Sequence, residues 1–250
     1  MNYKNTLYCK LEILIPSCDA YNDVWQYFFY YLHKNWNNCP LKINLSTNFL
    51  DFKYKNTNII KTGKDISWSD NLLIALSKIE SNYVLILIED LIFKNKISDF
   101  RFQQILNWIE INKPNYLKLT KSSNPRYIDD IAGDFPKSIP YKASLMPSIW
   151  RKKTLENLIV KGESAWDFEI YGSKRAEPLN GFYCLNDNFI NYNNSIIKGK
   201  WQKKIYDDLK IKNSSRLKMN FIEQLVYDFK TIVSKIFNML PFTIKKIIKF

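Results

Sequence analysis

Short apolar runs alternate with segments of helical periodicity along most of the chain. The apolar runs are bounded by polar breaks and predict strands at residues 11–15, 41–45, 58–61, 83–88 and 116–119. Apolar residues at helical spacing predict helices at residues 24–33, 70–79, 98–111 and 153–160. Strands separated by helices are typical of an α/β domain with a buried, mainly parallel sheet. We therefore predict an α/β fold whose mostly parallel central sheet is flanked by helices.

Two stretches refine this picture. The run at residues 83–88 is the most apolar and β-prone segment of the chain, so we predict that it forms the central strand. Residues 121–140 are polar and contain Pro125, Pro136 and Pro140, which predicts a long surface loop before an extended segment at residues 141–150.

The last part of the chain differs from the rest. Apolar residues recur at helical spacing from Phe221 to Phe237. From Ser214 onward the chain has seven Lys and Arg residues and only two carboxylates. We therefore divide the chain into a domain at residues 1–205 and a basic amphipathic helical segment at residues 206–250.

The C-terminal amphipathic helices are predicted to lie on an anionic membrane surface. Their apolar face can enter the headgroup boundary, and Pro241 separates it from a short basic end at Lys245, Lys246 and Lys249. The alternative is that the apolar face packs on the domain or on a second subunit.

Composition limits the class of protein. The chain has 250 residues, 46% hydrophobic and 24% charged, which excludes a disordered or collagen-like protein and suits one domain with an appendage. The net charge of +13 favours anionic partners, namely nucleotide phosphates, nucleic acid or a membrane surface. Codon usage in an A+T-rich genome is an alternative explanation of the many Lys and Asn residues, such as the run at residues 191–194.

Several functional classes lack their sequence signals. The four cysteines form no C-x-x-C pair and His33 is the only histidine, which argues against a structural zinc site or a Cys-His nucleophile. The N-terminus lacks the apolar core of a signal peptide, and the longest apolar run is far shorter than a membrane span. We expect a reducing, cytoplasmic location, peripheral to the inner face of the cell membrane.

Glu89 and Asp90 directly follow the predicted central strand. In an open α/β sheet ligands bind beyond the carboxyl ends of the strands. A divalent cation that bridges diphosphate oxygens needs a carboxylate at such a position. The alternative is an exposed acidic turn.

A second cluster lies between Gly162 and Arg175. Glu163, Asp167 and Glu169 stand beside Trp166 and Phe168, and such carboxylates can supply a general base on an apolar surface that binds a sugar ring. Partial burial would raise the pKa of such a carboxyl group toward neutrality. The alternative is a capped helix that Glu163 or Ser164 begins, with both aromatic rings in the core.

Weaker candidates lie at other strand ends and turns. Pro16, Ser17 and Asp19 follow the first strand, and Asp65 and Trp68 precede the helix at residues 70–79, so these residues are candidates to bind a base and ribose. Lys198 and Lys200 are placed in a Lys-Gly-Lys-Trp sequence and are candidates to stabilise a leaving diphosphate. A solvated turn is the alternative for the two lysines.

Taken in order, five segments resemble bacterial glycosyltransferases of the GT-A fold, which is Rossmann-like, of the kind encoded with capsule or O-antigen (lipopolysaccharide) assembly. They are Ile13-Leu14-Ile15-Pro16-Ser17, Trp68-Ser69, Leu85-Ile86-Leu87-Ile88-Glu89-Asp90, the 145–151 segment that ends in Ile149-Trp150-Arg151, and Glu163-Ser164-Ala165-Trp166-Asp167-Phe168-Glu169. Together they span about residues 10 to 205. Their order is more specific than any single motif.

The resemblance implies roles for these segments. The end of the first strand would bind the nucleotide, an Asp-any-Asp motif after the central strand would hold the metal and the donor diphosphate, and a later carboxylate would be the base of an inverting enzyme. Here the middle motif is Glu89-Asp90-Leu91, and Asp90 is the expected ligand of Mn²⁺ or Mg²⁺. Glu169 is slightly favoured as the base over Glu163 and Asp167, with Trp166 and Arg175 toward the acceptor.

The resemblance thus implies transfer of a hexose-type sugar from a nucleotide-sugar donor to a saccharide or lipid-linked saccharide acceptor in surface polysaccharide synthesis. The competing class is a non-catalytic basic binding protein, either a membrane-associated scaffold or a nucleic-acid binder. No helix-turn-helix, zinc-finger or RNP-type pattern is present in the sequence, and the basic residues are dispersed. We therefore expect no nucleic-acid partner.

Overall fold

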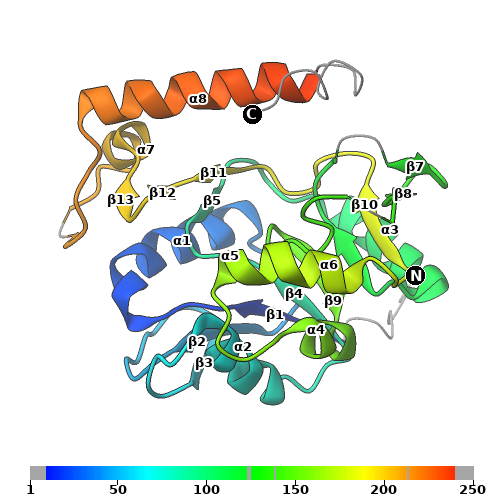
Figure 1. The fold of residues 1–250 in the computed structure, drawn as a ribbon. Helices are drawn as coiled ribbons and strands as arrows, with labels where there is room; N and C mark the ends of the chain where they lie inside the picture. The colour runs from blue at the N-terminus through cyan, green and yellow to red at the C-terminus, as the bar shows by residue number, and fades with distance from the viewer. Residues whose placement is uncertain (1–9, 123–124, 138, 213, 240–250) are drawn as a thin grey trace. The chain divides into compact units, whose positions relative to one another are not determined.

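The computed structural model describes residues 10–122, 125–137, 139–212 and 214–239. The chain divides into two compact units, Met1–Asn193 and Asn194–Phe250 (Figure 1). This division falls earlier in the chain than the boundary at residue 205 that the sequence suggested.

The first unit is built on a sheet whose described strands have the order β3-β2-β1-β4-β9-β6-β10-β8-β7. Its strands are β1 (Leu11–Ile15), β2 (Ile43–Thr47), β3 (Thr57–Lys61), β4 (Tyr83–Ile86), β6 (Tyr116–Lys118), β7 (Arg126–Tyr127), β8 (Ala132–Asp134), β9 (Ser148–Arg151) and β10 (Phe182–Leu185). Pairing is parallel from β3 through β4 and between β6 and β10, and it is antiparallel on both sides of β9 and of β8. All of these strands except β8 and β9 therefore run in one direction, which confirms the predicted mostly parallel sheet.

Burial explains why the first strands are easy to recognise. Every residue of β1, β2 and β4 is buried, because helices cover both faces of the sheet. The predicted central strand, β4, is an interior strand between β1 and β9. The carboxyl ends of β1, β4 and β6 consequently lie along one edge of the sheet.

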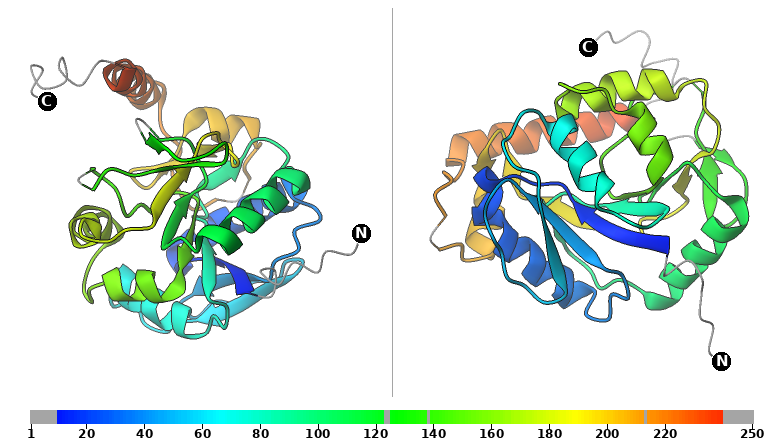
Figure 2. Two further views of the ribbon diagram at one scale, coloured as in Figure 1. Left: turned by 90° about the vertical axis from the view of Figure 1, so that its right-hand side faces the viewer. Right: turned by 90° about the horizontal axis from the view of Figure 1, so that it is seen from below.

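Helices cover the two faces of this sheet (Figures 1 and 2). They are α1 (Asn22–Asn35), α2 (Trp68–Ser77), α3 (Asp99–Asn112), α4 (Lys152–Leu158), α5 (Ala165–Asp167) and α6 (Ser173–Ala176), with a 3-10 turn η2 (Asp19–Tyr21) and a π-helical turn η3 (Phe168–Gly172). Leu72 of α2 and Leu155 of α4 share one core cluster with Leu14 of β1. On the other face, Trp36 at the end of α1 packs edge-on against Phe102 of α3, with ring centroids 4.9 Å apart.

The segment at residues 121–140 is not wholly a surface loop, so that prediction was wrong in part. β7 and β8 form an antiparallel pair that extends the sheet beyond β10. Gly133 of β8 allows this close packing, because a Cβ there would lie 2.7 Å from Cβ of Pro125. Strands of two and three residues are too short to produce a readable alternation.

A smaller two-stranded sheet completes the first unit. It pairs β5 (Leu91–Phe93), which begins directly after Asp90, with β11 (Tyr192–Asn194). The backbone N–H of Lys94 donates to the carbonyl of Asn191 at 2.9 Å. The end of the first unit therefore lies beside the segment that follows the central strand.

The described part of the second unit contains a hairpin and two helices: β12 (Ile196–Ile197), β13 (Lys200–Trp201), α7 (Lys203–Asp208) and α8 (Phe221–Met239). The hairpin turns at Lys198 and Gly199, which both have positive φ, as a two-residue type I′ turn requires. Trp201 is buried, and its Nε1 donates to Oγ of Ser214 at 2.8 Å.

Helix α8 covers the apolar residues that predicted a C-terminal helix. Among the described residues, no helix is both long and apolar enough to span a membrane. Pro241, Lys245, Lys246 and Lys249, which we predicted to form the basic end, lie outside the residues that the structure describes.

Candidate functional site

A cavity of about 270 Å³ opens at the carboxyl edge of the sheet, beyond β1 and β4. It brings together segments that are far apart in the sequence. Its lining residues are Pro16, Ser17, Cys18, Tyr21, Ser46, Asp65, Trp68, Asn71, Leu72, Ile88, Glu89, Asp90, Leu145 and Ala165. Six of the predicted donor-binding residues are in this set: Pro16, Ser17, Asp65, Trp68, Glu89 and Asp90.

Glu89 and Asp90 differ in their surroundings. Glu89 is 4% exposed, and its Oε1 accepts a hydrogen bond of 2.8 Å from Oγ of Ser17. Nε1 of Trp25 donates to the same Ser17 hydroxyl at 2.8 Å. Glu89 therefore ties the loop after β4 to the loop after β1, whereas Asp90 is only half-buried and borders the cavity.

Asp19 holds a neighbouring loop and is not among the residues that line the cavity. Its carboxylate accepts hydrogen bonds from the backbone N–H groups of Asn48, Phe49 and Leu50. In return, Oδ1 of Asn48 accepts from the backbone N–H of Asp19. Asp19 thus stabilises the chain after β2.

Asn71 is a pocket residue that the sequence analysis missed. Its Nδ2 donates to Oδ1 of Asp65 at 2.9 Å, while its buried Oδ1 has no hydrogen-bond partner among the described residues. A buried carbonyl oxygen without a partner is costly, so a donor group of a ligand in the cavity would satisfy it. The available signal was a polar residue on the otherwise apolar side of the predicted helix at residues 70–79.

Glu163 and Arg175 form a closed pair. Nη1 and Nη2 of Arg175 donate to Oε1 and Oε2 of Glu163, each at 2.8 Å, and Nε donates to the carbonyl of Leu158. Oε2 of Glu163 also accepts from the backbone N–H of Val160. This two-pronged geometry suits a structural link between α4 and the helices that follow.

Asp167 caps the start of α5. Its carboxylate accepts from the backbone N–H and Oγ of Ser164, while Oγ of Ser164 accepts from the backbone N–H of Asp167. The hydrogen bonds from the Ser164 hydroxyl and backbone lower the pKa of Asp167. The expectation of a raised pKa is therefore wrong for this carboxylate, and the capped-helix alternative describes it better.

Glu169 lies on the π-helical turn η3 and is not itself among the residues that line the cavity. Its Oε1 accepts hydrogen bonds from the backbone N–H of Leu145 at 2.7 Å and from Oγ of Ser144 at 2.9 Å. Leu145 lines the cavity. Single π-helical turns inside α-helices are rare, and those that occur are often at functional sites. Glu169 also differs from Glu163 and Asp167 in that its carboxylate is hydrogen-bonded to a residue that lines the cavity.

Tyr192 is affected by the charges of both Asp90 and Glu169. Burial raises the pKa of Tyr192, and the carboxylates of Asp90 and Glu169 raise it further. Lys118 stands at the carboxyl end of β6, where burial lowers its pKa against the opposing effects of Cys184 and Glu169. The sequence analysis missed both residues, because Tyr192 lies in an Asn-rich run and Lys118 at the end of a short strand.

The two aromatic residues of the cluster point in different directions. Phe168 is fully buried, with its ring centroid 5.4 Å from that of Trp68 and 6.2 Å from that of Trp150. Trp166, by contrast, is 71% exposed. The expectation of a core position holds for Phe168 only.

Lys198 and Lys200 belong to the second unit. Lys198 occupies the hairpin turn described above, as the solvated-turn alternative proposed. Nζ of Lys200 lies 2.6 Å from Oε1 of Glu223 on α8. Their role toward a leaving diphosphate stays a prediction.

The residues at the cavity suit a metal ion that is held jointly by the protein and a bound diphosphate, more than one that is held by protein ligands alone. Among the described residues, no three His, Cys, Asp or Glu side chains gather in a metal-binding group. Mg²⁺ keeps several waters and is commonly held by one or two carboxylates together with substrate phosphates. Asp90, half-buried at the cavity, fits that arrangement once a diphosphate supplies further oxygen ligands.

Comparison with known proteins identifies the fold. No protein-family model and no curated protein matches the sequence. The structure is similar to S. aureus TarS 1–349 in complex with UDP, with a TM-score of 0.53 and 14% identity over 73% of this chain and 59% of that chain. For S. aureus TarS 1–349 the TM-score is 0.50 at 13% identity over the same shares.

The chain thus spans less than two thirds of these TarS structures. At such identities the similarity shows the fold, a mixed α/β architecture with a large, mostly parallel central sheet flanked by helices. The predicted fold class is therefore confirmed.

Proposed function

We propose that this protein is a nucleotide-sugar-dependent glycosyltransferase of the GT-A type. The observation that carries the proposal is the cavity at the carboxyl edge of β1 and β4, which collects Ser17, Asp65 and Asp90. Glu169 is hydrogen-bonded to Leu145, which lines this cavity. The likeness in fold to TarS in complex with UDP supports it.

The donor nucleotide would bind in this cavity. Trp68 offers an aromatic face, and the Asp65 and Asn71 pair offers polar groups for a base and ribose. The diphosphate would lie toward Asp90, which would hold a divalent cation, Mn²⁺ or Mg²⁺. When bound, such an ion would neutralise charge on the diphosphate oxygens.

Glu169 is the proposed general base. It would take the proton of the acceptor hydroxyl while the acceptor oxygen forms a bond to the anomeric carbon of the donor. The bond from that carbon to the diphosphate oxygen would break, and its electron pair would leave with the nucleoside diphosphate. Attack from the side opposite the leaving group inverts the anomeric configuration. Positioning and charge stabilisation would supply most of the rate acceleration.

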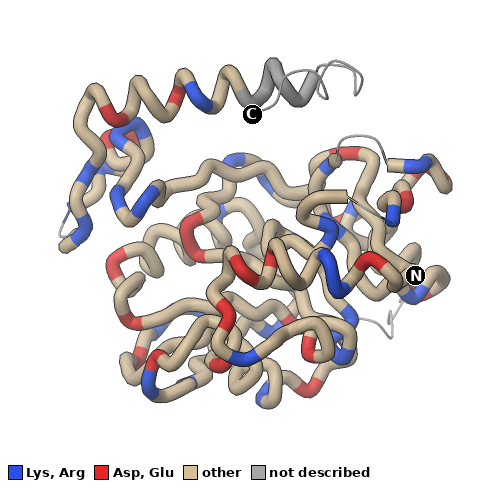
Figure 3. Tube along the Cα trace, viewed as in Figure 1, with Lys and Arg blue, Asp and Glu red and all other residues tan. Residues whose placement is uncertain are grey.

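We further propose a saccharide or lipid-linked saccharide acceptor in the synthesis of a surface polysaccharide, with Trp166 beside the acceptor. Arg175 is engaged by Glu163, so its part would be to hold the helix. The exposed apolar side of α8 would lie on the cytoplasmic face of an anionic membrane. The described basic residues are spread over the chain (Figure 3), which gives no support to a nucleic-acid binder.

A thermal-shift experiment tests the proposal. Because a ligand that binds only the folded state raises Tm, UDP or another nucleoside diphosphate should raise the Tm of the full chain, and Mn²⁺ should increase that shift. Asp90→Asn should remove the Mn²⁺-dependent part and leave the Tm without ligand nearly unchanged. An equal shift in Mn²⁺ and in chelator would refute the metal role, and no shift with any nucleoside diphosphate would refute the proposed function.

A further inference from the structure

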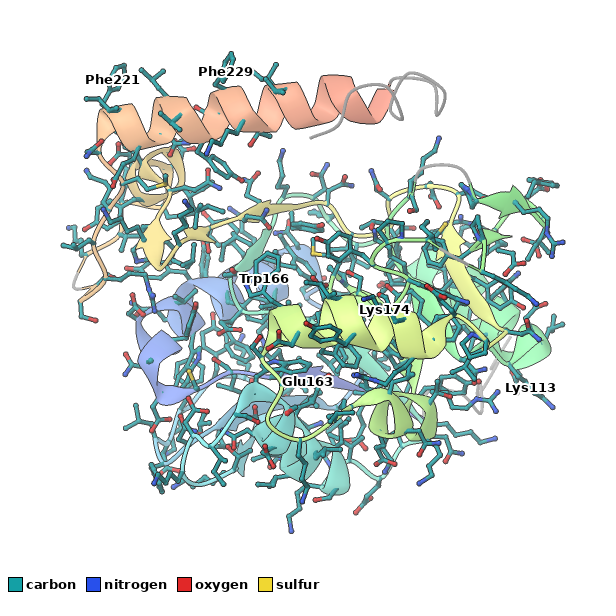
Figure 4. All side chains as sticks on the ribbon, in the orientation of Figure 1. Lys113, Glu163, Trp166, Lys174, Phe221 and Phe229 are labelled. Carbon is teal, nitrogen blue, oxygen red and sulfur yellow. The ribbon has the colours of Figure 1, made fainter. Side chains whose placement is uncertain are left out.

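An exposed surface runs along α5, η3 and α6, and we call it the helical platform. It consists of Trp166, Ile170, Tyr171 and Lys174, all exposed. Nζ of Lys174 lies 5.5 Å from the ring centroid of Tyr171. Trp166 and Lys174 stand toward opposite ends of the same helical run (Figure 4).

The π-helical turn creates this surface. Phe168 and Gly172 face the core, and a Cβ at Gly172 would lie 3.1 Å from two ring carbons of Phe168. Because the turn is wider than an α-helical one, Ile170 and Tyr171 are both left on the outside. The sequence therefore buries one aromatic ring and exposes two others in the same short segment.

One end of the platform adjoins the cavity. Ala165, which precedes Trp166, lines the cavity, and Ile170 follows the proposed base, Glu169. From Trp166 to Lys174 the run is about 12 Å long at the rise of an α-helix, which exceeds one sugar ring. A chain of sugars whose end reaches Glu169 can therefore extend over this surface.

The charged groups of the segment are held in different ways. Glu163 and Arg175 form an ion pair, whereas the carboxylates of Asp167 and Glu169 keep their charge and accept hydrogen bonds from Ser164, Ser144 and Leu145. Lys174 has no ion pair among the described residues, and its contact with the Tyr171 ring leaves its N–H groups available to an anion. Exposed aromatic faces beside an ammonium group without an ion pair can bind a sugar that carries a negative charge.

We propose that the helical platform binds the acceptor, and that this acceptor is an anionic saccharide whose carboxylate or phosphate group pairs with Lys174. The inference rests on the proposed glycosyl transfer and specifies its acceptor class. Trp166 and Tyr171 stack on sugar rings, and Lys174 selects for charge.

Calorimetric titration of the full chain, saturated with UDP, tests this selection. The ligands are trigalacturonic acid, which carries carboxylates, and glucose 6-phosphate, which carries a phosphate, with maltotriose and glucose as their neutral counterparts. At 50 mM salt we expect trigalacturonic acid to bind at least tenfold more tightly than maltotriose, or glucose 6-phosphate at least tenfold more tightly than glucose. The difference in affinity should shrink at 300 mM salt. A preference for only one of the two would identify the anionic group.

Variants separate charge from stacking. Lys174→Gln should remove the preference for the charged ligand, and Lys174→Arg should retain it. Trp166→Ala should weaken the binding of charged and neutral saccharides alike. Lys78→Gln changes an exposed lysine at the end of α2 and is the matched control, with no effect expected. Circular dichroism verifies that each variant is folded.

The results distinguish this inference from the proposed function. If UDP binds while neutral and charged saccharides bind with equal affinity, or while no saccharide binds, the anionic acceptor is refuted. Either result leaves the proposed donor site standing. If Lys174→Gln leaves the preference intact, the platform is not its source. If UDP fails to bind, the glycosyltransferase proposal fails, whatever the saccharides do.

Discussion

Two helical regions expose large apolar side chains, and they do so in different ways. The run at residues 165–176 is interrupted by the π-helical turn and buries Phe168 in the core of the first unit. Helix α8 of the second unit runs from Phe221 to Met239 without interruption. Its exposed apolar residues form a stripe at helical spacing: Phe221, Ile222, Leu225, Val226, Phe229 and Ile232. Figure 4 shows the labelled pair, Phe221 and Phe229, projecting from the same side of the helix.

The difference underlies the two partners that we propose for these surfaces. The platform combines exposed aromatic rings with a lysine, which is what the proposed saccharide acceptor requires. The stripe on α8 is aliphatic and aromatic with the polar residues on other sides, for example Glu223 paired to Lys200. Such a stripe fits the disordered apolar boundary of a membrane. The interrupted run is therefore the one that we propose to carry the base, and the regular helix is the one that we propose to contact a membrane.

The first test of this comparison concerns Glu169, which the π-helical turn carries. Glu169→Gln should lower turnover by about 10²- to 10⁴-fold, because a general base contributes that much, while UDP binding is unchanged. Single-turnover release of labelled UDP measures the loss. Glu163→Gln and Asp167→Asn are controls that should retain most of the activity of the folded enzyme. A folded Glu169→Gln enzyme with normal turnover would place the base elsewhere.

The second test compares buried with exposed aromatic rings. Phe168→Ala should lower the free energy of unfolding by about 3–5 kcal/mol, because it removes a fully buried ring from between Trp68 and Trp150. Phe229→Ala on α8, where the ring is 67% exposed, should change it by no more than about 0.5 kcal/mol. Urea unfolding of both variants gives the two values. Equal costs would mean that α8 is packed against protein in solution.

The third test addresses the surface role of α8. Replacing Ile222 and Phe229 together by Glu should abolish flotation of the full chain with phosphatidylglycerol vesicles, because each inserted side chain is worth about 1.5–3 kcal/mol. Ile111→Glu is the matched control, since Ile111 is an isolated, 78% exposed residue on α3. Flotation that is the same for all three proteins would exclude a membrane role for the stripe.

The last test concerns the cap of α5. Ser164→Ala should cost about 1 kcal/mol at pH 7, because Ser164 is the N-cap and bonds to Asp167. The pKa of Asp167 is lowered by the hydrogen bonds from Ser164, so its stabilising effect is complete above its ordinary value of 3.8 and is lost as the pH falls through the folded pKa.

The difference in Tm between wild type and Ser164→Ala should therefore narrow below about pH 4. Melting curves between pH 2.5 and pH 7 measure it, and a constant difference across this range would contradict the contribution of the Asp167 carboxylate to the cap.

Local pattern in the sequence was sufficient for much of the fold. β1 and β4 are buried on both faces, so their apolar runs identified them directly. The helices α1 and α3 were found from their periodicity, with ends shifted by one or two residues. The short strands β7, β8 and β10 were missed, because their pairing depends on partners elsewhere in the chain and not on local alternation.

The sequence by itself determined that polar residues follow the first and central strands, since Ser17 and Asp90 come directly after buried apolar runs. Only the tertiary structure decided that the loop after β1 meets the loop after β4 through the Ser17–Glu89 hydrogen bond, because that contact requires β1 and β4 to be neighbours in the sheet. The tertiary structure alone also distinguished Glu163, Asp167 and Glu169 from one another, through the groups that each carboxylate contacts. Side-chain partners are long-range contacts, and periodicity, which reports burial, carries no information about them.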